Sequence, residues 1–430
     1  MFPTPRSNRP AGWLGPATVV VFAAGTVWRW LHITQFHDPR RYVYSDMADY
    51  ILLAKRMAVA GHTPTVTDVT HPPGVTAIFA FFYRHDPSLE WLVWLQFAVA
   101  AVVPLAVGAL GWVAFDRTTA RLAVVLSSLY FPFVNFGGYF LSEVYVMLAV
   151  PATLTLYLLA TRCRSTPRVV GTGLLAGGAF SGALALKLLA LPAILGFGAF
   201  HWLFSRGAPR RVKTIALGAL LLGALPVATV LSRRCTVANE GRFCLVSNKS
   251  AADFLLGHYS RIRGISWRSP DGQRLFRYSS PSAHQRYAVQ VEVPFAFTDG
   301  ASNLHAASKW IRDHPIEALV LSVEHVYDLF IGSLPWPSFE TEYWVGAEEA
   351  HFLFIVFVLL PALCLCLDSI RRQGLRGFVG SEAMLVLSPI LGVIAAVFIA
   401  TGEPRYRVPF DGLFILVAIQ FYRSFGRVRS

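Results

Sequence analysis

The sequence has 430 residues, of which 54% are hydrophobic and only 15% are charged. An ordinary soluble domain has about 25% charged residues, so this composition excludes an ordinary soluble enzyme, and it also excludes disordered, collagen-like and coiled-coil chains. The remaining class is an all-α membrane protein with many spans, each of which needs about 20 apolar residues. The net charge of +13 is spread over short loops and tails, so we expect no nucleic-acid partner.

Ten apolar runs follow one another along the chain and predict about ten transmembrane helices. The runs are Trp13–Leu31, Trp91–Val113, Leu122–Val134, Val144–Ala160, Val169–Leu186, Leu188–Phe204, Thr214–Leu231, Phe352–Leu367, Val379–Ala400 and Val408–Phe421. If the N-terminus is cytoplasmic, every second connection is cytoplasmic too, and those connections hold 17 Lys and Arg residues. Because cytoplasmic loops are rich in Lys and Arg, the alternation predicts a multi-pass protein of a plasma or bacterial inner membrane, with both termini cytoplasmic.

The runs divide the chain into three parts. Residues 1–231 are predicted to form an N-terminal transmembrane module of seven spans, and residues 351–430 a C-terminal module of three spans. Between them, residues 232–350 are too long for a plain connector and predict an extracytoplasmic loop domain of mixed structure, with one helix at Ser302–Leu321.

Two cysteines lie in this loop domain. Cys235 and Cys244 are nine residues apart in CTVANEGRFC. That separation suits a hairpin closed by a disulfide in an oxidising compartment, and two free thiols are the alternative.

The first outer loop, residues 32–90, carries an acidic motif and two predicted helices. In YSDMADYILLAKRMAVAG, apolar side chains recur at helical spacing, which predicts an amphipathic helix on the outer surface. These side chains are Met47, Tyr50, Ile51 and Ala54. The following THPPGVTAIFAFFY predicts a re-entrant or interfacial helix that begins with proline.

Ionisable side chains gather at the predicted outer boundary of the membrane, although they come from five places in the sequence. They are Asp46, Asp49, His71, Glu143, Lys187, Glu403, Arg405, Arg407 and Asp411. Charged groups in or beside membrane spans are costly and usually functional. Their convergence at one depth predicts an active site on the outer face.

Three carboxylates are candidates for catalysis. Asp46 and Asp49 lie one helical turn apart, so both can face one cavity, and either can take a proton from an incoming hydroxyl group. Glu143 can position an acceptor, share a metal ion or assist the base. The alternative is a structural role in a first helical turn, beginning at Ser45 or Ser142, where acidic residues stabilise the helix dipole.

Four basic or aromatic positions are candidates for binding an anionic substrate. Lys187 interrupts an apolar stretch, and Arg405 and Arg407 flank Tyr406 just before the last span. Such cations can hold a phosphate at the bilayer surface. The alternatives are a snorkelling lysine and ion pairs of the arginines with Glu403 or with lipid headgroups.

His71, in THPPG, is a candidate ligand for substrate or metal, and packing at a helix start is the alternative. A divalent cation is therefore left open as the cofactor. The sequence has no glycine-rich nucleotide-binding loop, which argues against an ATP-driven pump.

The motifs follow one another in a recognisable order. YSDMADY lies in the first outer loop, and HPPG, the acid Glu143, a lysine-bearing fifth or sixth span and PRYRVP before the last helix come after it. This set resembles the GT-C superfamily of polyprenyl-phosphate-sugar-dependent glycosyltransferases. It is most similar to the protein mannosyltransferase and aminoarabinose transferase branch, glycosyltransferase family 39. The resemblance covers most of residues 29–200 and 380–422.

The resemblance implies a GT-C-like fold and an inverting sugar transfer on the outer face of the membrane. The donor would be a polyprenyl-phosphate sugar, and the acceptor a hydroxyl group of a lipid, glycan or protein. Asp46 would be the base, and Arg405 and Arg407 would bind the lipid phosphate. Many members have adjacent Asp and Glu, whereas here Met47 follows Asp46 and the next acid is Asp49, so the choice of base and the need for a metal stay open.

Two other classes are weighed against this one. A secondary transporter or lipid flippase would use the outer-face acids to relay protons, and it predicts broken helices near the midplane and inverted repeats. The sequence shows no repeat. A structural membrane subunit would leave the gathered charges without a role.

Overall fold

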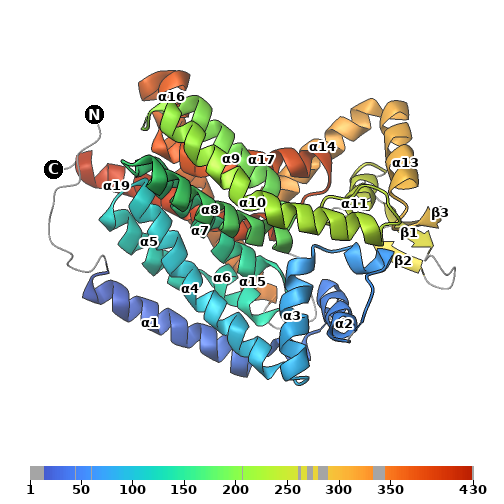
Figure 1. Ribbon diagram of the computed structural model, residues 1–430. Coiled ribbons are helices and arrows are strands. Elements are labelled where there is room, and N and C mark those ends of the chain that lie inside the picture. Colours follow the sequence, from blue (N-terminus) through green and yellow to red (C-terminus); the bar gives the residue numbers. More distant parts are fainter. Residues whose placement is uncertain are drawn as a thin grey trace.

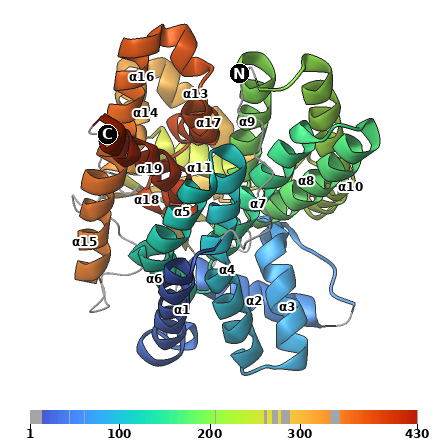
Figure 2. The ribbon, with the colours of Figure 1, turned by 90° about the vertical axis from the view of Figure 1, so that its left-hand side faces the viewer.

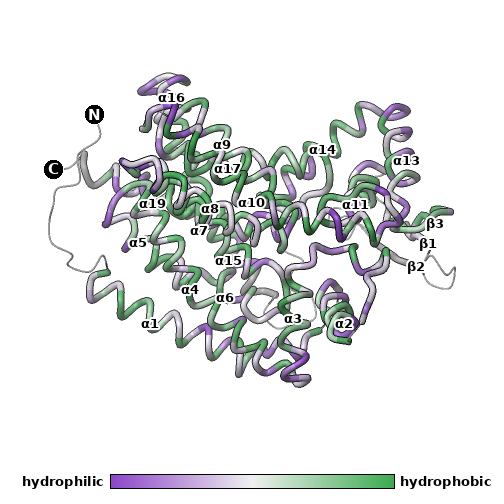
Figure 3. Tube along the Cα trace, in the orientation of Figure 1, coloured by the Kyte–Doolittle hydropathy of each residue, from purple (hydrophilic) through white to green (hydrophobic). Residues whose placement is uncertain are grey.

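Long helices dominate the fold of the chain (Figure 1). The computed structural model describes residues 14–43, 45–59, 61–205, 207–259, 263–268, 275–278, 289–332 and 344–428. The first residues of α1 (Pro16–Leu31) and the last of α19 (Asp411–Val428) lie at one end of the helical bundle. A small sheet and several short helices lie at the opposite end, and hydrophobic residues predominate along the long helices (Figure 3).

Seven helical segments of the described chain are long and apolar enough to cross a membrane. Five of them are single helices: α4 (Glu90–Ala114), α7 (Glu143–Arg162), α8 (Thr166–Leu186), α10 (Arg210–Ala238) and α17 (Glu382–Ile399). The sixth, Glu348–Val379, combines most of α15 (Trp344–Phe354) with η5 (Ile355–Leu359) and α16 (Leu360–Val379). The seventh, Pro404–Phe425, combines α18 (Pro404–Arg407), η6 (Val408–Phe410) and most of α19.

Three shorter or bent segments account for the other predicted spans. α5 (Arg117–Leu129) is followed, across a 61° bend, by α6 (Phe131–Asn135) and η4 (Phe136–Gly138), and the pair would make an eighth span. α1 has 16 residues and α9 (Ala190–Phe204) has 15. Every predicted apolar run thus falls mainly on a helix, except that Trp13 lies outside the described residues. The all-α, multi-pass class is confirmed, and the number of ten spans stays a prediction.

The first outer loop folds into short helices, η1 (His32–Phe36), η2 (Pro39–Arg41), α2 (Asp46–Ala58), η3 (Val66–Val69) and α3 (Pro73–His85). The predicted amphipathic helix is confirmed, since α2 buries all four of the apolar side chains that predicted it. α3 begins with proline, as predicted. A methyl group on Gly74 would lie 2.6 Å from the carbonyl oxygen of Ala185, so glycine is what lets α3 approach the end of α8.

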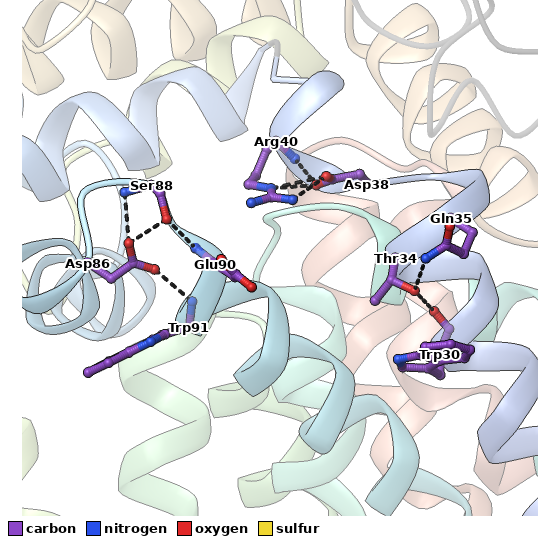
Figure 4. A network of polar contacts seen from close by, with 9 residues as sticks. All are labelled: Trp30, Thr34, Gln35, Asp38, Arg40, Asp86, Ser88, Glu90 and Trp91. Atoms are coloured by element: carbon purple, nitrogen blue, oxygen red, sulfur yellow. Dashed lines mark hydrogen bonds and ion pairs between the residues drawn. The ribbon is translucent and has the colours of Figure 1, made fainter.

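Local hydrogen bonds fix the two ends of this loop (Figure 4). At the start, the Nη2 atom of Arg40 lies 2.7 Å from a carboxylate oxygen of Asp38. At the end, the carboxylate of Asp86 accepts hydrogen bonds from the backbone N–H groups of Ser88 and Trp91, at 3.0 and 2.9 Å. Asp86 therefore stabilises the turn that leads from α3 into α4.

The loop domain combines helices with a three-stranded sheet. Its elements are α11 (Ser250–Gly257), β1 (Arg263–Arg268), β2 (Leu275–Tyr278), β3 (Val289–Ala296), α13 (Gly300–Asp313) and α14 (Pro315–Phe330). β1 is the central strand, antiparallel to β2 and parallel to β3. The buried indole of Trp267 donates to the Oδ1 atom of Asn303 at 2.7 Å, which joins the sheet to α13.

The single helix predicted at Ser302–Leu321 is wrong. The structure has two helices there, α13 and α14, which meet at His314 and Pro315. Proline has no backbone N–H group and clashes with the preceding turn, so it begins a new helix and cannot continue the old one.

Candidate active site

A charged network lies where α2, α7, the end of α8 and α18 meet. Its centre is the buried guanidinium of Arg405 in α18. The Nη2 atom of Arg405 donates to a carboxylate oxygen of Asp46 at 2.8 Å. Its Nε atom lies 3.2 Å from Glu143 and 3.1 Å from Glu403. One arginine therefore holds together carboxylates from three parts of the sequence.

Asp46 is the first residue of α2 and is 4% exposed. The preceding Ser45 has a φ of 48°, which is uncommon for a residue with a side chain, and its hydroxyl does not cap the helix. Burial by itself raises the pKa of the Asp46 carboxyl, but the charges of Arg405, Lys249 and His71 outweigh it and hold that pKa well below its usual range. The carboxyl is therefore ionised at neutral pH, as a proton acceptor or a metal ligand must be.

Glu143 and Lys187 form the second half of the network. Glu143 begins α7, is 1% exposed, and accepts a hydrogen bond of 2.6 Å from the ammonium group of Lys187. Lys187 follows the last residue of α8, where the extended backbone directs the chain towards α9. Its Nζ atom also lies 4.8 Å from the centre of the Tyr406 ring. Lys187 therefore faces the network instead of extending into solvent.

Arg407 takes part in a different network, although it is only two residues from Arg405. Its fully buried guanidinium pairs with Asp411 at 2.8 Å and donates to the carbonyl oxygen of Phe330 at 3.1 Å. The hydroxyl group of Tyr130 donates to the same carboxylate of Asp411 at 2.6 Å. Residues two apart on a helix point to roughly opposite sides, which explains why the two arginines separate. The predicted arginine pair is thus divided between two networks.

Asp49 and His71 lie next to the central network. The Nε2 atom of His71 lies 3.5 Å from a carboxylate oxygen of Asp49, and the His71 ring meets the edge of Tyr50 with 4.9 Å between ring centres. One ligand atom from each of Asp46, Asp49 and His71 lies within 4.8 Å of the others. Two carboxylates and an imidazole are ligands that Mn²⁺ or Zn²⁺ accepts, so these three residues could hold a divalent cation.

The loop domain adds residues that sequence reasoning missed. Lys249 lies beside α11, close enough to lower the pKa of the Asp46 carboxyl, and its ammonium group is 3.9 Å from Asp253. The neighbouring Asn248 binds the first outer loop, because its backbone N–H group donates to the carbonyl oxygen of Val69 at 2.9 Å. Its position in LVSNKSAADF is the only feature of the sequence that could have indicated Lys249 as a site residue, because lysines are common in polar loops.

Close-packed contacts hold the loop domain over the network, and a disulfide closes the start of the domain on itself. The structure contains a disulfide between Cys235 and Cys244, with Cα atoms 5.4 Å apart. Gly257 of α11 packs against the carbonyl oxygen of Ala400, and Gly402 packs against that of His325 in α14. The turn that carries Glu403 and Arg405 is therefore held between α11 and α14.

No family model and no curated protein sequence matches the chain. Solved structures do match. The archaeal oligosaccharyltransferase AglB from Archaeoglobus fulgidus, in complex with an inhibitory peptide and a dolichol-phosphate, has a TM-score of 0.53 at 12% identity, over 96% of this chain and 52% of that one. The Archaeoglobus fulgidus enzyme tethered to an acceptor peptide with the NVT sequon gives 0.52 at 13% identity, over 94% and 49%.

The same archaeal enzyme in complex with Zn and sulfate also matches, with a TM-score of 0.52 at 13% identity, over 95% of this chain and 50% of that one. The chain thus spans about half the length of each of these proteins. Identity at this level carries information about the fold alone. The likeness confirms the GT-C-like fold that the family resemblance implies.

Proposed function

We propose that the chain is an integral membrane glycosyltransferase. It would move a sugar from a polyprenyl-phosphate donor to a hydroxyl group of a lipid, glycan or protein at the outer face of the membrane, with inversion at the anomeric carbon. The observation that carries the proposal is the ion pair between Arg405 and Asp46, residues 359 positions apart, inside a GT-C-like fold. An archaeal enzyme of that fold has been solved with a dolichol-phosphate, which supports a lipid-phosphate donor here.

In the proposed reaction, the acceptor hydroxyl attacks the anomeric carbon, and the bond from that carbon to the phosphate oxygen breaks. The hydroxyl proton passes to the carboxylate of Asp46 or Asp49, and the polyprenyl phosphate leaves with the bonding electrons. Arg405 and Lys187 would stabilise the charge that develops on the phosphate. Tyr406 lies against Lys187 and would line the same subsite.

Donor binding would also change the base. In the structure, the charge of Arg405 lowers the pKa of the Asp46 carboxyl, which makes it a weak proton acceptor. If a phosphate oxygen of the donor binds the Arg405 guanidinium instead, Asp46 loses that partner and the pKa of its carboxyl rises. The base would therefore be strongest when the donor is in place, which limits wasteful transfer to water.

A divalent cation fits beside this base. Asp46, Asp49 and His71 would hold it, and it would supply Lewis-acid stabilisation of the leaving phosphate. The archaeal enzyme in complex with Zn and sulfate supports testing this site with Zn²⁺ as well as Mn²⁺ and Mg²⁺. If these residues bind metal, Asp49→Asn and His71→Gln should each weaken Mn²⁺ binding at least tenfold, as measured by electron paramagnetic resonance of the bound ion.

The proposal is tested with purified protein, synthetic polyprenyl-phosphate sugars and an acceptor extract. Release of free polyprenyl phosphate reports transfer. Asp46→Asn should reduce the rate about 10²-fold or more, the usual contribution of a general base. Asp313→Asn is the matched control, since it makes the same change at an exposed residue outside the network and should keep the rate. Failure of every sugar donor, together with dissipation of a solute gradient in vesicles, would favour the transporter.

The branch within the superfamily is a finer part of the same proposal. The order of YSDMADY, HPPG and PRYRVP supports glycosyltransferase family 39, whose acceptors are hydroxyl groups, over an oligosaccharyltransferase, whose acceptor is a peptide. Mass spectrometry of surface glycans, lipids and proteins with and without the chain identifies the product. A product linked through peptide asparagine would reject the hydroxyl-acceptor branch and keep the glycosyltransferase class.

A further inference from the structure

A cavity lies at the end of the bundle opposite the charged network. It has a volume of about 570 Å³ and is bounded by the end of α9, the start of α10 and the last turn of α16. Figure 2 looks onto this end of the molecule, where α9 and α16 stand on either side of α17. α7 begins at Glu143 in the network and ends at Arg162, whose charge interacts with Glu382, two residues beyond Gly380 of the cavity lining. A 20-residue helix, or roughly 30 Å, therefore separates the cavity from the network.

The lining of the cavity is basic. Arg210, Lys213 and Arg376 contribute side chains, and no carboxylate lines the cavity among the residues that the structure describes. The ammonium group of Lys213 donates to the carbonyl oxygens of His201, Trp202 and Ser205, at 3.2, 3.1 and 2.8 Å. Lys213 thus satisfies the carbonyl groups at the end of α9, which would otherwise repel an anion.

The two arginines are available for a ligand. Both side chains are exposed, and in the described part of the chain neither pairs with a carboxylate. Arg210 stacks on Trp202, with its Cζ atom 5.9 Å from the ring centre, a contact that leaves the guanidinium N–H groups free to donate. Two arginines facing one cavity provide the fork-shaped donors that phosphate oxygens accept.

Exposed apolar side chains border the same cavity. Leu203 and Phe204 at the end of α9 are 54% and 46% exposed, and Leu375 of α16 is 66% exposed. Gly374 has a φ of +67°, which breaks α16 and redirects its last turn, so Leu375 and Arg376 lie together at the cavity. Apolar surface next to paired arginines matches the two halves of an anionic lipid, its acyl chains and its phosphate.

We propose that this cavity binds the phosphate headgroup of an anionic membrane glycerophospholipid, with the acyl chains lying over Leu203, Phe204 and Leu375. Basic pockets at the ends of membrane helices bind such headgroups, and each Lys or Arg contributes about 1 kcal/mol, or roughly fivefold in affinity. The site is separate from the charged network and does not depend on the reaction proposed there.

The experiment uses the full chain in detergent and native mass spectrometry of bound lipid. Phosphatidylglycerol should bind at least tenfold more tightly than phosphatidylcholine. Arg210→Ala and Arg376→Ala should each weaken phosphatidylglycerol binding about fivefold, and Arg376→Lys should recover only part of that loss, because an ammonium group keeps the charge without the fork of donors. Arg168→Ala is the matched control, because Arg168 is an exposed arginine at the start of α8 that does not line the cavity.

Three results would overturn the proposal. The first is equal binding of the two lipids, and the second is phosphatidylglycerol binding that survives loss of both arginines. The third is full displacement of phosphatidylglycerol by millimolar inorganic phosphate, which would make the cavity a site for the free ion. Both arginines are exposed, so the unfolding temperature of the variants should equal that of the native protein, and a weaker affinity then reports the cavity itself.

Discussion

Arg405→Met tests whether one cation holds the charged network together. The substitution removes the guanidinium from Asp46, Glu143 and Glu403, three carboxylates that are each less than 10% exposed. Removing one partner of a buried ion pair costs about 3–5 kcal/mol, because the remaining charge stays desolvated. We expect Arg405→Met to lower the free energy of unfolding by about that amount, measured by SDS titration in mixed micelles.

The second variant of the test removes a carboxylate as well. Adding Asp46→Asn to Arg405→Met should recover about 1.5–3 kcal/mol, the value of one charge-assisted hydrogen bond. The coupling between the two side chains is the sum of the losses in the two single variants minus the loss in the double variant. Arg423→Met is the matched control. Arg423 pairs with Asp116 at 2.8 Å, but Asp116 is 43% exposed, so this loss should cost no more than about 1 kcal/mol.

The same variants predict a change with pH. Because the pKa of the Asp46 carboxyl is lowered in the folded state, its stabilising contribution is complete above its ordinary value near 4 and is lost only as pH falls through the lowered pKa. In Arg405→Met, burial acts with less opposition and the folded-state pKa lies closer to the ordinary value, so the contribution of the Asp46 carboxyl is smaller and its loss is complete at a higher pH. The difference in unfolding free energy between each protein and its Asp46→Asn partner measures this shift.

Two outcomes would refute the reasoning. If Arg405→Met costs no more than Arg423→Met, the network does not depend on its central cation. If Asp46→Asn and Arg405→Met are additive in their effects on stability, the 2.8 Å contact between them carries no coupling energy.

Two further predictions concern packing and orientation. Gly74→Ala should displace α3 from the end of α8, since the added methyl group would lie 2.6 Å from a backbone carbonyl oxygen, and should reduce sugar transfer at least tenfold by moving the His71 turn. Gly178→Ala, with open space around its Cα, should leave transfer unchanged, and equal rates for both variants would contradict the packing argument. The orientation is tested in a variant that lacks Cys163, Cys364 and Cys366, the three cysteines outside the disulfide. In that background, Ser308→Cys should react with an impermeant maleimide from outside, and Ser165→Cys should not. The reverse labelling would invert the predicted topology.

Periodicity and composition were enough to predict most of the helices. The helix of the first outer loop was predicted from four apolar residues at helical spacing, and those same residues are buried in α2. The prediction over Ser302–Leu321 failed because helix-forming residues lie on both sides of Pro315, and a single proline outweighs them. α1 and α9 show a different limit, because hydropathy finds the apolar run and does not determine how many residues stay helical.

The sequence predicted some residues of the candidate site but not the partner of each residue. Charge at a membrane boundary pointed to Asp46, Glu143, Lys187 and Arg405, because a charge there needs a partner. Which partner each one takes depends on tertiary packing, so the separation of Arg407 from Arg405 could not be read from PRYRVP. The segment PRYRVP is too short for its sequence to predict a helix. Only in a helix do residues two apart, such as Arg405 and Arg407, point to opposite sides.

The charge balance of the network bears on the cofactor that the sequence left open. Arg405 and Lys187 contact three carboxylates, Asp46, Glu143 and Glu403, so acids already outnumber cations before any donor binds. A polyprenyl-phosphate sugar brings another negative charge into a partly desolvated place, which is costly unless a further cation accompanies it. A divalent ion held by Asp46, Asp49 and His71 would restore the balance, so we expect donor and ion to bind cooperatively.

Linkage then requires the donor to tighten Mn²⁺ binding by the same factor by which Mn²⁺ tightens donor binding. Titrations of each ligand at fixed concentrations of the other measure both factors. Donor binding that is indifferent to Mn²⁺, Mg²⁺, Zn²⁺ and chelator would mean that the cations already present, with Lys249 of the loop domain nearby, are sufficient to hold the phosphate.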